Sequence, residues 1–493
     1  MLQQRPIVAK KIIEMRILLV NIKAAVEACF LLFLIAGSMP ASHLRVQGAN
    51  QQGTGLTTAT PLKHVVIIMA ENHSFDNVFG IYPNQNTTSY NRTINPLGIT
   101  VPRNLLSLNQ SASLTVVPPS SFSTNNPVEG YDTYHGDWDG GKMDGFAAHS
   151  GPQSMTYFTS GQYGIEWNWA EEYGLGDMYF SSYLSMTAPN RLFSLAGQTS
   201  VNADYGPPPT IPFNKSIMGQ LTNYGVSWKY FIKNASGNNY PLNYFNGIEN
   251  YTYDIASWDE FYADLQAGSL PSVSWMSPLG GGAQGLDQHP PLNVFQGELW
   301  ILGTVNAVMQ SPEWNSSVIF ITYDEGGGYY DQVPPPSLDG VQFGFRVPLI
   351  VISPYAKENY VSHTVLNHGS LLALLDYNWK LPPLNQFVAD SRIPLDFFDF
   401  QAQERGPLLL NQSSQFPVTP QIPFANLAYP REGSSDLTLT QIDQQDGNAT
   451  YQSTITSVNP HVSANTPYAA YALYVAAALV FITAIVAFRQ RKR

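Results

Sequence analysis

Two apolar runs of the chain each end in a group of oxygen-bearing side chains. The run KHVVIIMA is followed by Glu71, Asn72 and His73, and the run VIFITY is followed by Asp324, Glu325 and three glycines. Carboxylate and amide oxygens suit a hard divalent cation, and adjacent carboxylates in a buried place are costly unless a cation or water compensates them. We therefore predict that the two groups converge on one cation of unknown identity.

Each group also has a purely structural interpretation. The first box, ENHSFDN, is compatible with a turn from a strand into a helix that Asn72 or Ser74 caps. The second is compatible with a solvated surface turn. The local sequence alone leaves these alternatives open.

Two other segments contain groups that can act on a substrate. Thr187 lies in YFSSYLSMTAPNRLFSLAG, and His289 lies in LDQHPPLNVFQGELW. Alone, Thr187 is typical of a helix cap and His289 of a structural histidine with satisfied hydrogen bonds. Beside a cation, however, a threonine hydroxyl becomes a usable nucleophile, and a histidine can protonate a leaving oxygen.

Short apolar runs alternate with helical patterns between residues 61 and 400. Strands are predicted at residues 64–69, 226–231, 272–276, 318–323 and 347–353, and helices at 297–309 and 365–379. This alternation predicts an α/β fold, with helices on both faces of the sheet. Sheets of this kind bind ligands beyond the carboxyl ends of their strands, where the two acidic groups stand.

Six motifs in order resemble the phosphoesterase family of bacterial phospholipases C and acid phosphatases, which is related to the alkaline phosphatase and sulfatase superfamily. The resemblance covers about residues 63–400. Its motifs are the ENHSFDN box, the small-x-T-x-PNR box at 185–191, LPSVSW at 270–275, HP at 289–290, DEGG at 324–327, and the stretch from RVPLIVISP to HGSLL.

The resemblance implies an alkaline-phosphatase-like sheet and a role for individual residues. It implies that Glu71 and Asn72 of the first box and Asp324 and Glu325 of the DEGG box bind metal. It also implies that Thr187 attacks phosphorus. It also implies that His135 and His289 contact the phosphoryl oxygens or the leaving group. Asn190 and His368 are the implied substrate-binding residues.

One position departs from the family pattern. Family members often carry His where this chain has Gln332, and a neutral amide cannot act as an acid. Either the role is dispensable, or another histidine such as His368 supplies it, or the activity is altered.

The two ends of the chain are predicted to direct it to a membrane. A basic start followed by an apolar run at about 24–37 is typical of a signal peptide or signal anchor, although Lys23 and Glu27 weaken this interpretation against a structural helix. Residues 468–488 carry no charge, are long enough to span a bilayer and precede a basic tip. The predicted segments are 1–42 (signal peptide or anchor), 43–60 (linker), 61–400 (catalytic domain), 401–467 (polar spacer or accessory segment), 468–488 (transmembrane helix) and 489–493 (cytoplasmic tip).

Composition agrees with an exported protein that does not bind nucleic acid. The net charge of −12 argues against a phosphate-backbone partner, and the single cysteine, Cys29, leaves the catalytic body without a disulfide. Glycosylation sequons are scattered between the two ends and indicate a glycoprotein whose catalytic domain is extracellular. They begin at Asn86, Asn91, Asn109, Asn214, Asn234, Asn250, Asn315, Asn411 and Asn448.

These observations predict an extracellular, metal-dependent hydrolase of phosphate esters with a threonine nucleophile. The membrane tether and the aromatic content of 13% fit a phospholipase C that acts on lipid phosphodiesters, but a tethered enzyme that acts on soluble phosphate esters fits as well. We predict an acid phosphatase, because a weakly charged, Tyr-rich surface with many sequons would tolerate an acidic medium. A non-catalytic surface glycoprotein that keeps the fold is the alternative of another class. The presence of every predicted ligand and of Thr187 argues against it.

Overall fold

Three neighbouring strands form the centre of the sheet because their sequences are apolar on both faces. They are β11 (Ser317–Tyr323), β1 (His64–Ala70) and β10 (Val273–Met276). Every residue of these strands except the first of β1 is buried. They therefore run through the core and can deliver the residues that follow them to a fixed place.

The computed structural model describes the greater part of the predicted catalytic domain. The described residues are 57–80, 82, 115–118, 120–204, 210–233, 240–279 and 286–411. All of them belong to one compact unit, Met1–Tyr429, and a second unit covers Pro430–Arg493.

The main sheet has eight strands in the order β15-β4-β14-β11-β1-β10-β7-β9. All neighbours pair in parallel except at β14, which is antiparallel to both β11 and β4. The sheet is therefore mixed, and the carboxyl ends of β1, β10 and β11 lie at one edge. The outer strands are β15 (Tyr360–Ser362), β4 (Gly174–Gly176), β14 (Leu349–Ile352), β7 (Trp228–Ile232) and β9 (Ile255–Ser257).

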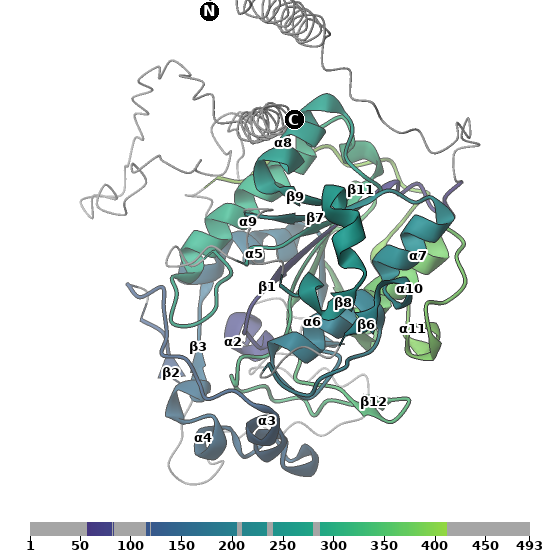
Figure 1. Cartoon of the computed structure of the whole chain (residues 1–493). Helices are drawn as coiled ribbons and strands as arrows, with labels where there is room; N and C mark the ends of the chain where they lie inside the picture. The colour runs from purple at the N-terminus through teal and green to yellow at the C-terminus, as the bar shows by residue number, and fades with distance from the viewer. Residues whose placement is uncertain are drawn as a thin grey trace, which may run out of the picture. The chain divides into compact units, whose positions relative to one another are not determined.

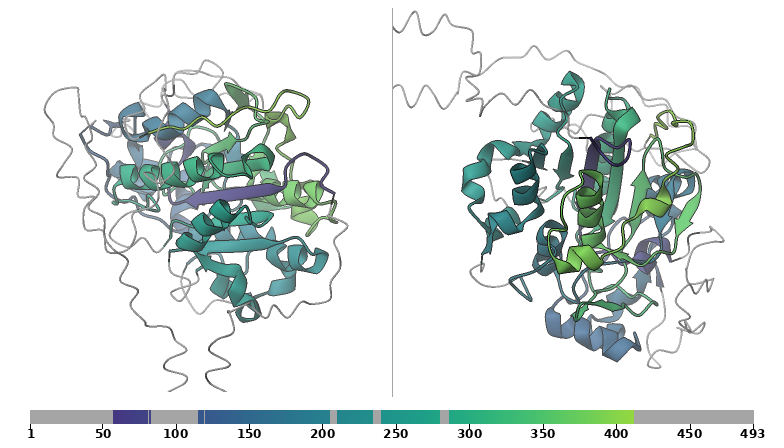
Figure 2. Two further views of the ribbon diagram at one scale, coloured as in Figure 1. Left: turned by 90° about the horizontal axis from the view of Figure 1, so that it is seen from above. Right: turned by 90° about the vertical axis from the view of Figure 1, so that its right-hand side faces the viewer.

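Helices cover both faces of this sheet (Figures 1 and 2). Helices α5 and α8 both pack against α9, and α6 packs against both α7 and α10, which separates the helices into two layers. The confirmed class is α/β with a mixed sheet between two helical layers. The helices are α5 (Ser160–Glu172), α8 (Trp258–Ala267) and α9 (Val294–Met309) in one layer, and α6 (Thr187–Ala196), α7 (Ile217–Tyr224), α10 (His368–Asn378) and α11 (Gln386–Asp390) in the other.

Short elements complete the described fold around the edge that carries the acidic groups. Helices α3 and α4 pack against each other (Figure 1). These elements are α2 (Phe75–Phe79), α3 (Tyr131–Trp138), α4 (Phe146–His149), β2 (Thr115–Val116), β3 (Thr156–Tyr157), β5 (Tyr179–Phe180), β6 (Ile211–Pro212), β8 (Phe245–Asn246), β12 (Ser337–Leu338), β13 (Val341–Gln342) and β16 (Leu366–Asn367).

All five predicted strands and both predicted helices are present, with shifted boundaries. Helix α9 begins before the predicted residue 297 because the side chain of Asn293 caps it and accepts the amide of Phe295. Helix α10 begins after the predicted residue 365 because Asn367 forms a capping box with Ser370. Side-chain caps, rather than the apolar pattern, thus set where these helices start.

Among the described residues no helix is both long and apolar enough to cross a membrane. The predicted signal segment, transmembrane helix and basic tip lie outside the described residues, as do most of the linker and of the polar spacer.

Candidate active site

The chain turns sharply where β1 ends, and the turn holds the first pair of predicted ligands. Glu71 and Asn72 follow the strand, and Asn72 has a φ of 66°, in the left-handed region that Asn tolerates better than most residues. Its carbonyl packs so closely on Gly327 that a Cβ at Gly327 would lie 2.1 Å from the carbonyl oxygen. The glycines that follow Asp324 and Glu325 therefore let the two turns touch.

The end of β11 holds the second pair. Oδ1 of Asp324 accepts the backbone amide of Asn72 at 3.2 Å and that of Glu325 at 2.8 Å. Oε2 of Glu325 accepts the amide of Gly327 at 2.6 Å and the hydroxyl of Tyr134 at 2.8 Å. The parallel pairing of β1 with β11 brings the two boxes together. Their role as metal ligands remains a prediction.

Arg191 on α6 joins the two boxes. Its Nε lies 3.0 Å from Oδ2 of Asp324, and its Nη2 lies 3.2 Å from Oε1 of Glu71. Nη2 also faces the carbonyls of Met69 and Ala70 at 3.4 and 3.3 Å. Sequence reasoning included this arginine in the PNR box but gave it no role. A buried guanidinium with two carboxylates fixes α6 against the ends of both strands.

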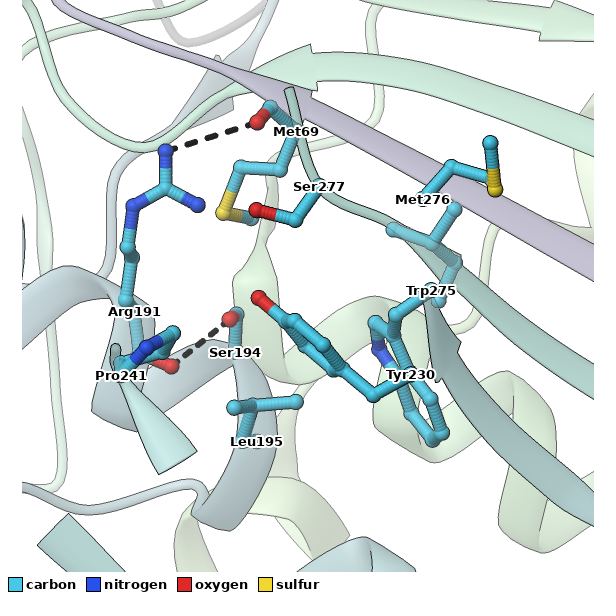
Figure 3. A pocket seen from close by; sticks show the side chains of 10 residues that line it. Met69, Arg191, Ser194, Leu195, Tyr230, Pro241, Trp275, Met276 and Ser277 are labelled. Atoms are coloured by element: carbon cyan, nitrogen blue, oxygen red, sulfur yellow. Dashed lines mark hydrogen bonds between the residues drawn. The ribbon is translucent and has the colours of Figure 1, made fainter. Parts of the chain in front are cut away.

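Arg191 also lines a small cavity (Figure 3). Its volume is about 10 Å³, and Tyr230, Met69 and Leu195 are among its lining residues. The hydroxyl of Ser194 donates to the backbone carbonyl of Arg191 at 2.8 Å. A space of this size holds about one water molecule, so it is not the substrate site.

Thr187 is the first residue of α6 and is 6% exposed. It stands four residues before Arg191, and residues at this spacing share one helix face, so Thr187 lies on the side of α6 that meets the acidic boxes. The next residue, Ala188, donates its amide to Oδ1 of Asp204 at 2.6 Å. A carboxylate at this place stabilises the first turn of the helix that carries the predicted nucleophile.

Asn190 holds the loop that leads into Thr187. Its Oδ1 accepts the amide of Tyr183 at 2.8 Å, and its Nδ2 donates to the carbonyls of Tyr183, Ser185 and Met186 at 2.8–3.1 Å. Direct substrate contact would require Asn190 to give up some of these bonds. The geometry makes it a positioning residue, and its predicted substrate contact stays untested.

Burial dominates the electrostatics of the site. It raises the pKa of Glu71, Asp324, Glu325 and Glu129, and Arg191 opposes this shift at Glu71 and Asp324. Like charges reinforce the shift, because Glu325 faces both Glu129 and Asp324. The cluster holds more acidic groups than its single guanidinium can neutralise.

Several polar atoms of this cluster are buried without a hydrogen-bond partner among the described residues. They are both amide atoms of Asn72, Oε1 of Glu129 and Oε1 of Glu325. In the described part of the chain, no group of three or more His, Cys, Asp or Glu side chains stands arranged to hold an ion. Unsatisfied hard oxygens in a region of excess negative charge nevertheless have the donor chemistry that fits a divalent cation.

His289 and Glu129 meet at the edge of the cluster. His289 Nε2 lies 3.6 Å from Glu129 Oε1, and its side chain is 32% exposed. The amide of His289 donates to Oδ1 of Asp287 at 3.2 Å, and the carbonyl of Asp287 accepts the amide of Glu71 at 2.8 Å. The structure therefore places His289 beside the predicted ligands. Sequence reasoning missed Glu129, because an isolated acid in a loop gives no signal of its own.

His135 lies on α3, and its described contacts are local. Its Nδ1 faces the carbonyl of Tyr131 at 2.8 Å, and its ring packs on Tyr131 with centroids 4.1 Å apart. Its helix is tied to the cluster through the bond from Tyr134 to Glu325. The predicted contact with phosphoryl oxygens stays a prediction.

His368 is buried at the start of α10 with both ring nitrogens engaged. Nε2 lies 2.7 Å from the carbonyl of Asp324, and Nδ1 lies 2.8 Å from the hydroxyl of Tyr179. Burial lowers the pKa of His368 to about 4, so it is neutral at pH 7. The geometry makes it a support for Asp324, and its predicted substrate contact is not tested.

Gln332 belongs to a separate buried network. Its amide groups donate to the carboxylate of Asp76, and Arg346 pairs with Asp76 at 3.0 Å and with Asp331 at 2.8 Å. All three charged side chains are fully buried. A neutral amide at Gln332 therefore completes a structural network.

Sequence comparison identifies the chain as a phosphoric ester hydrolase. The profile of the Phosphoesterase family matches residues 62–382, well over half of the 493-residue chain. The chain belongs to this family.

Among similar curated proteins is phospholipase C B of Mycobacterium tuberculosis, 26% identical over 405 residues, which cover 66% of this chain and 75% of that one. The hemolytic phospholipase C of Pseudomonas aeruginosa is 25% identical over 421 residues, which cover 70% and 57% of the two chains. A solved protein of the alkaline phosphatase superfamily from Vibrio parahaemolyticus matches 46% of this chain and 62% of its own with 11% identity. The TM-score of this match is 0.32.

Proposed function

We propose that the chain hydrolyses phosphate esters with a divalent cation and with Thr187 as nucleophile. The observation that carries this proposal is the bridge from Arg191 to Glu71 and Asp324. It places the helix face that starts at Thr187 against carboxylates and unpartnered amide and carboxylate oxygens. A nucleophile and an ion site are thereby available to one phosphoryl group.

The bound cation would be held by Glu71, Asn72, Asp324 and Glu325, and it supplies positive charge that stabilises the transferring phosphoryl group. The Thr187 hydroxyl releases its proton to solvent as its Oγ attacks phosphorus, and the bond to the leaving oxygen breaks. His289, the exposed histidine beside the cluster, donates a proton to that oxygen. Water then releases phosphate or the phosphomonoester from Thr187 and restores its hydroxyl.

The charge of the site favours a phosphodiester as substrate. A diester carries one negative charge near neutral pH and a monoester up to two, so the diester meets less repulsion from the surrounding carboxylates. The names of the similar proteins, phospholipases C, point to the same class. A phosphomonoester, which the sequence favoured, is the second candidate, because burial raises the pKa of these carboxyls and an acidic medium would neutralise part of the cluster.

The test is an assay of three substrates with and without chelator. We expect bis-p-nitrophenyl phosphate and phosphatidylcholine vesicles to be hydrolysed faster than p-nitrophenyl phosphate at pH 7. A chelator should abolish turnover, and added divalent metal should restore it. Faster monoester turnover at low pH would favour the acid phosphatase. Full turnover by protein shown to be metal-free would contradict the proposal that a cation is needed for hydrolysis. No turnover in any assay would favour a non-catalytic surface glycoprotein.

We also propose that the catalytic domain faces the cell exterior and is tethered by residues 468–488. Within the described residues, the sequon asparagines Asn214, Asn250 and Asn315 are exposed, as glycan acceptors must be. Deleting residues 468–493 should release active protein into the medium, with a mass that falls on endoglycosidase treatment. Unglycosylated protein whose catalytic domain resists external protease on intact cells would contradict this topology.

A further inference from the structure

A second pair of carboxyl groups lies in the core behind the candidate active site. Glu166 on α5 and Glu298 on α9 are both 0% exposed. Among the described residues, no lysine or arginine contributes to the electrostatics of either carboxyl. Two ionised carboxylates buried as neighbours without a compensating cation would repel each other strongly, so only one of them can carry the charge.

Hydrogen bonds assign that charge to Glu298. Its Oε1 accepts the backbone amide of Glu166 at 3.0 Å, and its Oε2 accepts that of Ile165 at 3.2 Å. Two N–H donors favour an ionised carboxylate. No backbone amide donates to Glu166 in the described structure, and its Oε2 has no hydrogen-bond partner there. A buried oxygen without a partner is far less costly on a neutral acid than on a carboxylate.

The hydroxyl of Tyr323 has two polar neighbours and only one proton, so one of these neighbours must donate to it. The Tyr323 oxygen lies 2.5 Å from Oε1 of Gln288 and 3.0 Å from Oε1 of Glu166. The Gln288 amide is oriented by its Nε2, which donates to the carbonyl of Val294 at 3.2 Å, so its Oε1 must accept. A hydroxyl has one proton, and Gln288 takes it. The contact between Tyr323 and Glu166 is then a hydrogen bond only if Glu166 supplies the proton.

The surroundings of Glu166 agree with a protonated acid. Burial raises the pKa of Glu166 to about 8. The titratable groups that face it are Glu298 from α9, Tyr163 from its own helix and Tyr323 from β11. The ring of His73 meets both tyrosines edge-on. Glutamate and tyrosine side chains carry no positive charge, so none of the three groups that face Glu166 would draw its proton away.

Gln288 is the link from this network to the active site. It stands between Asp287 and His289, is fully buried, and has a φ of 67°, which is costly for a residue with a side chain. Its carbonyl faces Nε2 of His73 at 2.9 Å. A Cβ at Gly297 of α9 would come within 2.2 Å of the Gln288 side chain, so α9 is shaped to admit it.

We infer that Glu166 keeps its proton in the folded protein and, through Tyr323 and Gln288, positions the loop that carries Asp287 and His289. Glu166 contacts neither the predicted nucleophile nor the predicted metal ligands in the described structure, so it is a positioning residue. The effect on turnover rests on the proposed function, whereas the protonation of Glu166 does not.

The test compares Glu166→Gln with Glu166→Ala across pH. The amide of Gln can donate to Tyr323 as a protonated acid does, whereas Ala cannot. We expect Glu166→Gln to keep kcat within about threefold of wild type at pH 6–7 and to lose less activity than wild type above pH 8. Glu166→Ala and Tyr323→Phe should each lose at least tenfold in kcat at every pH, with a smaller change in KM. A Glu166 that only fills space would give Gln and Ala variants with the same pH profile as wild type.

A second readout, thermal unfolding, needs no activity. The folded protein holds a proton that the unfolded chain releases above the ordinary pKa of 4.5. Wild-type stability should therefore fall relative to Glu166→Gln as the pH rises from about 5 to about 8, and the difference should level off above that. Parallel curves of stability against pH for the two proteins would contradict a protonated Glu166, even if turnover proved normal. Diverging curves in a protein without turnover would keep the protonation and reject the proposed function instead.

Discussion

Replacing Thr187 with Ala is expected to lower kcat by several powers of ten, each of which corresponds to about 1.4 kcal/mol of activation free energy. The reason is that the variant lacks the only hydroxyl at the start of α6 on the face that meets the acidic boxes. The ligand residues and Arg191 keep their contacts, since none of these involves the Thr187 side chain in the described structure. The measurement is steady-state turnover of bis-p-nitrophenyl phosphate by metal-loaded protein.

Two variants control this experiment. Thr187→Ser keeps a hydroxyl and should keep part of the activity. Ser194→Ala removes a hydroxyl from the same helix, where it donates to the carbonyl of Arg191, and should stay within a fewfold of wild type. Near wild-type turnover by folded Thr187→Ala would mean that an activated water or another hydroxyl attacks phosphorus.

Replacing Asp324 with Asn should damage both catalysis and stability. The amide keeps a shape that can accept the amides of Asn72 and Glu325, but it loses the charge that pairs with buried Arg191 at 3.0 Å. Breaking a buried ion pair from one side costs about 3–5 kcal/mol of unfolding free energy. We also expect loss of the bound cation and a fall in kcat of at least a hundredfold.

Urea unfolding, metal content and turnover are the measurements for Asp324→Asn. The matched control is Asp259→Asn on α8, which removes an exposed carboxylate outside the site. It should leave metal content and turnover unchanged and lower the unfolding free energy by no more than about 1 kcal/mol, because Asp259 lies in the first turn of its helix. A folded Asp324→Asn protein with wild-type metal content and activity would remove Asp324 from the ion site.

The sequence predicts the middle of this fold well because the central strands are long and apolar. Strands β1, β10 and β11 end where the apolar run ends, and polar residues follow at once. The outer strand β4 gives no such signal, because it is three residues long and begins and ends in glycine. Gly174 is required there since a Cβ would lie 2.5 Å from the ring of Phe397, a contact across more than two hundred residues that no local pattern reveals.

The sequence likewise predicts some residues of the candidate site and misses others. The two acidic boxes are visible in the sequence because each follows a strand directly, and parallel neighbours bring strand ends together. Arg191 and Glu129 are not visible as partners because each acts through a residue far away in the chain. Asp204 is not visible because its partner is a backbone amide, that of Ala188, which carries no sequence signal. For His368 and Asn190 the substrate contact that the resemblance implies stays a prediction. The structure shows in addition that their polar atoms hold Asp324 and the loop before Thr187, a role that the sequence did not reveal.

The most direct test of Thr187 as the nucleophile is to stop the wild-type enzyme with acid during turnover of a phosphodiester and to map phosphorus on its peptides by mass spectrometry. We expect a covalent phosphoryl adduct on Thr187, the same adduct on the serine of Thr187→Ser, and no adduct at this position in Thr187→Ala. An adduct on another residue, or none at any quench time in an enzyme that turns over rapidly, would contradict it.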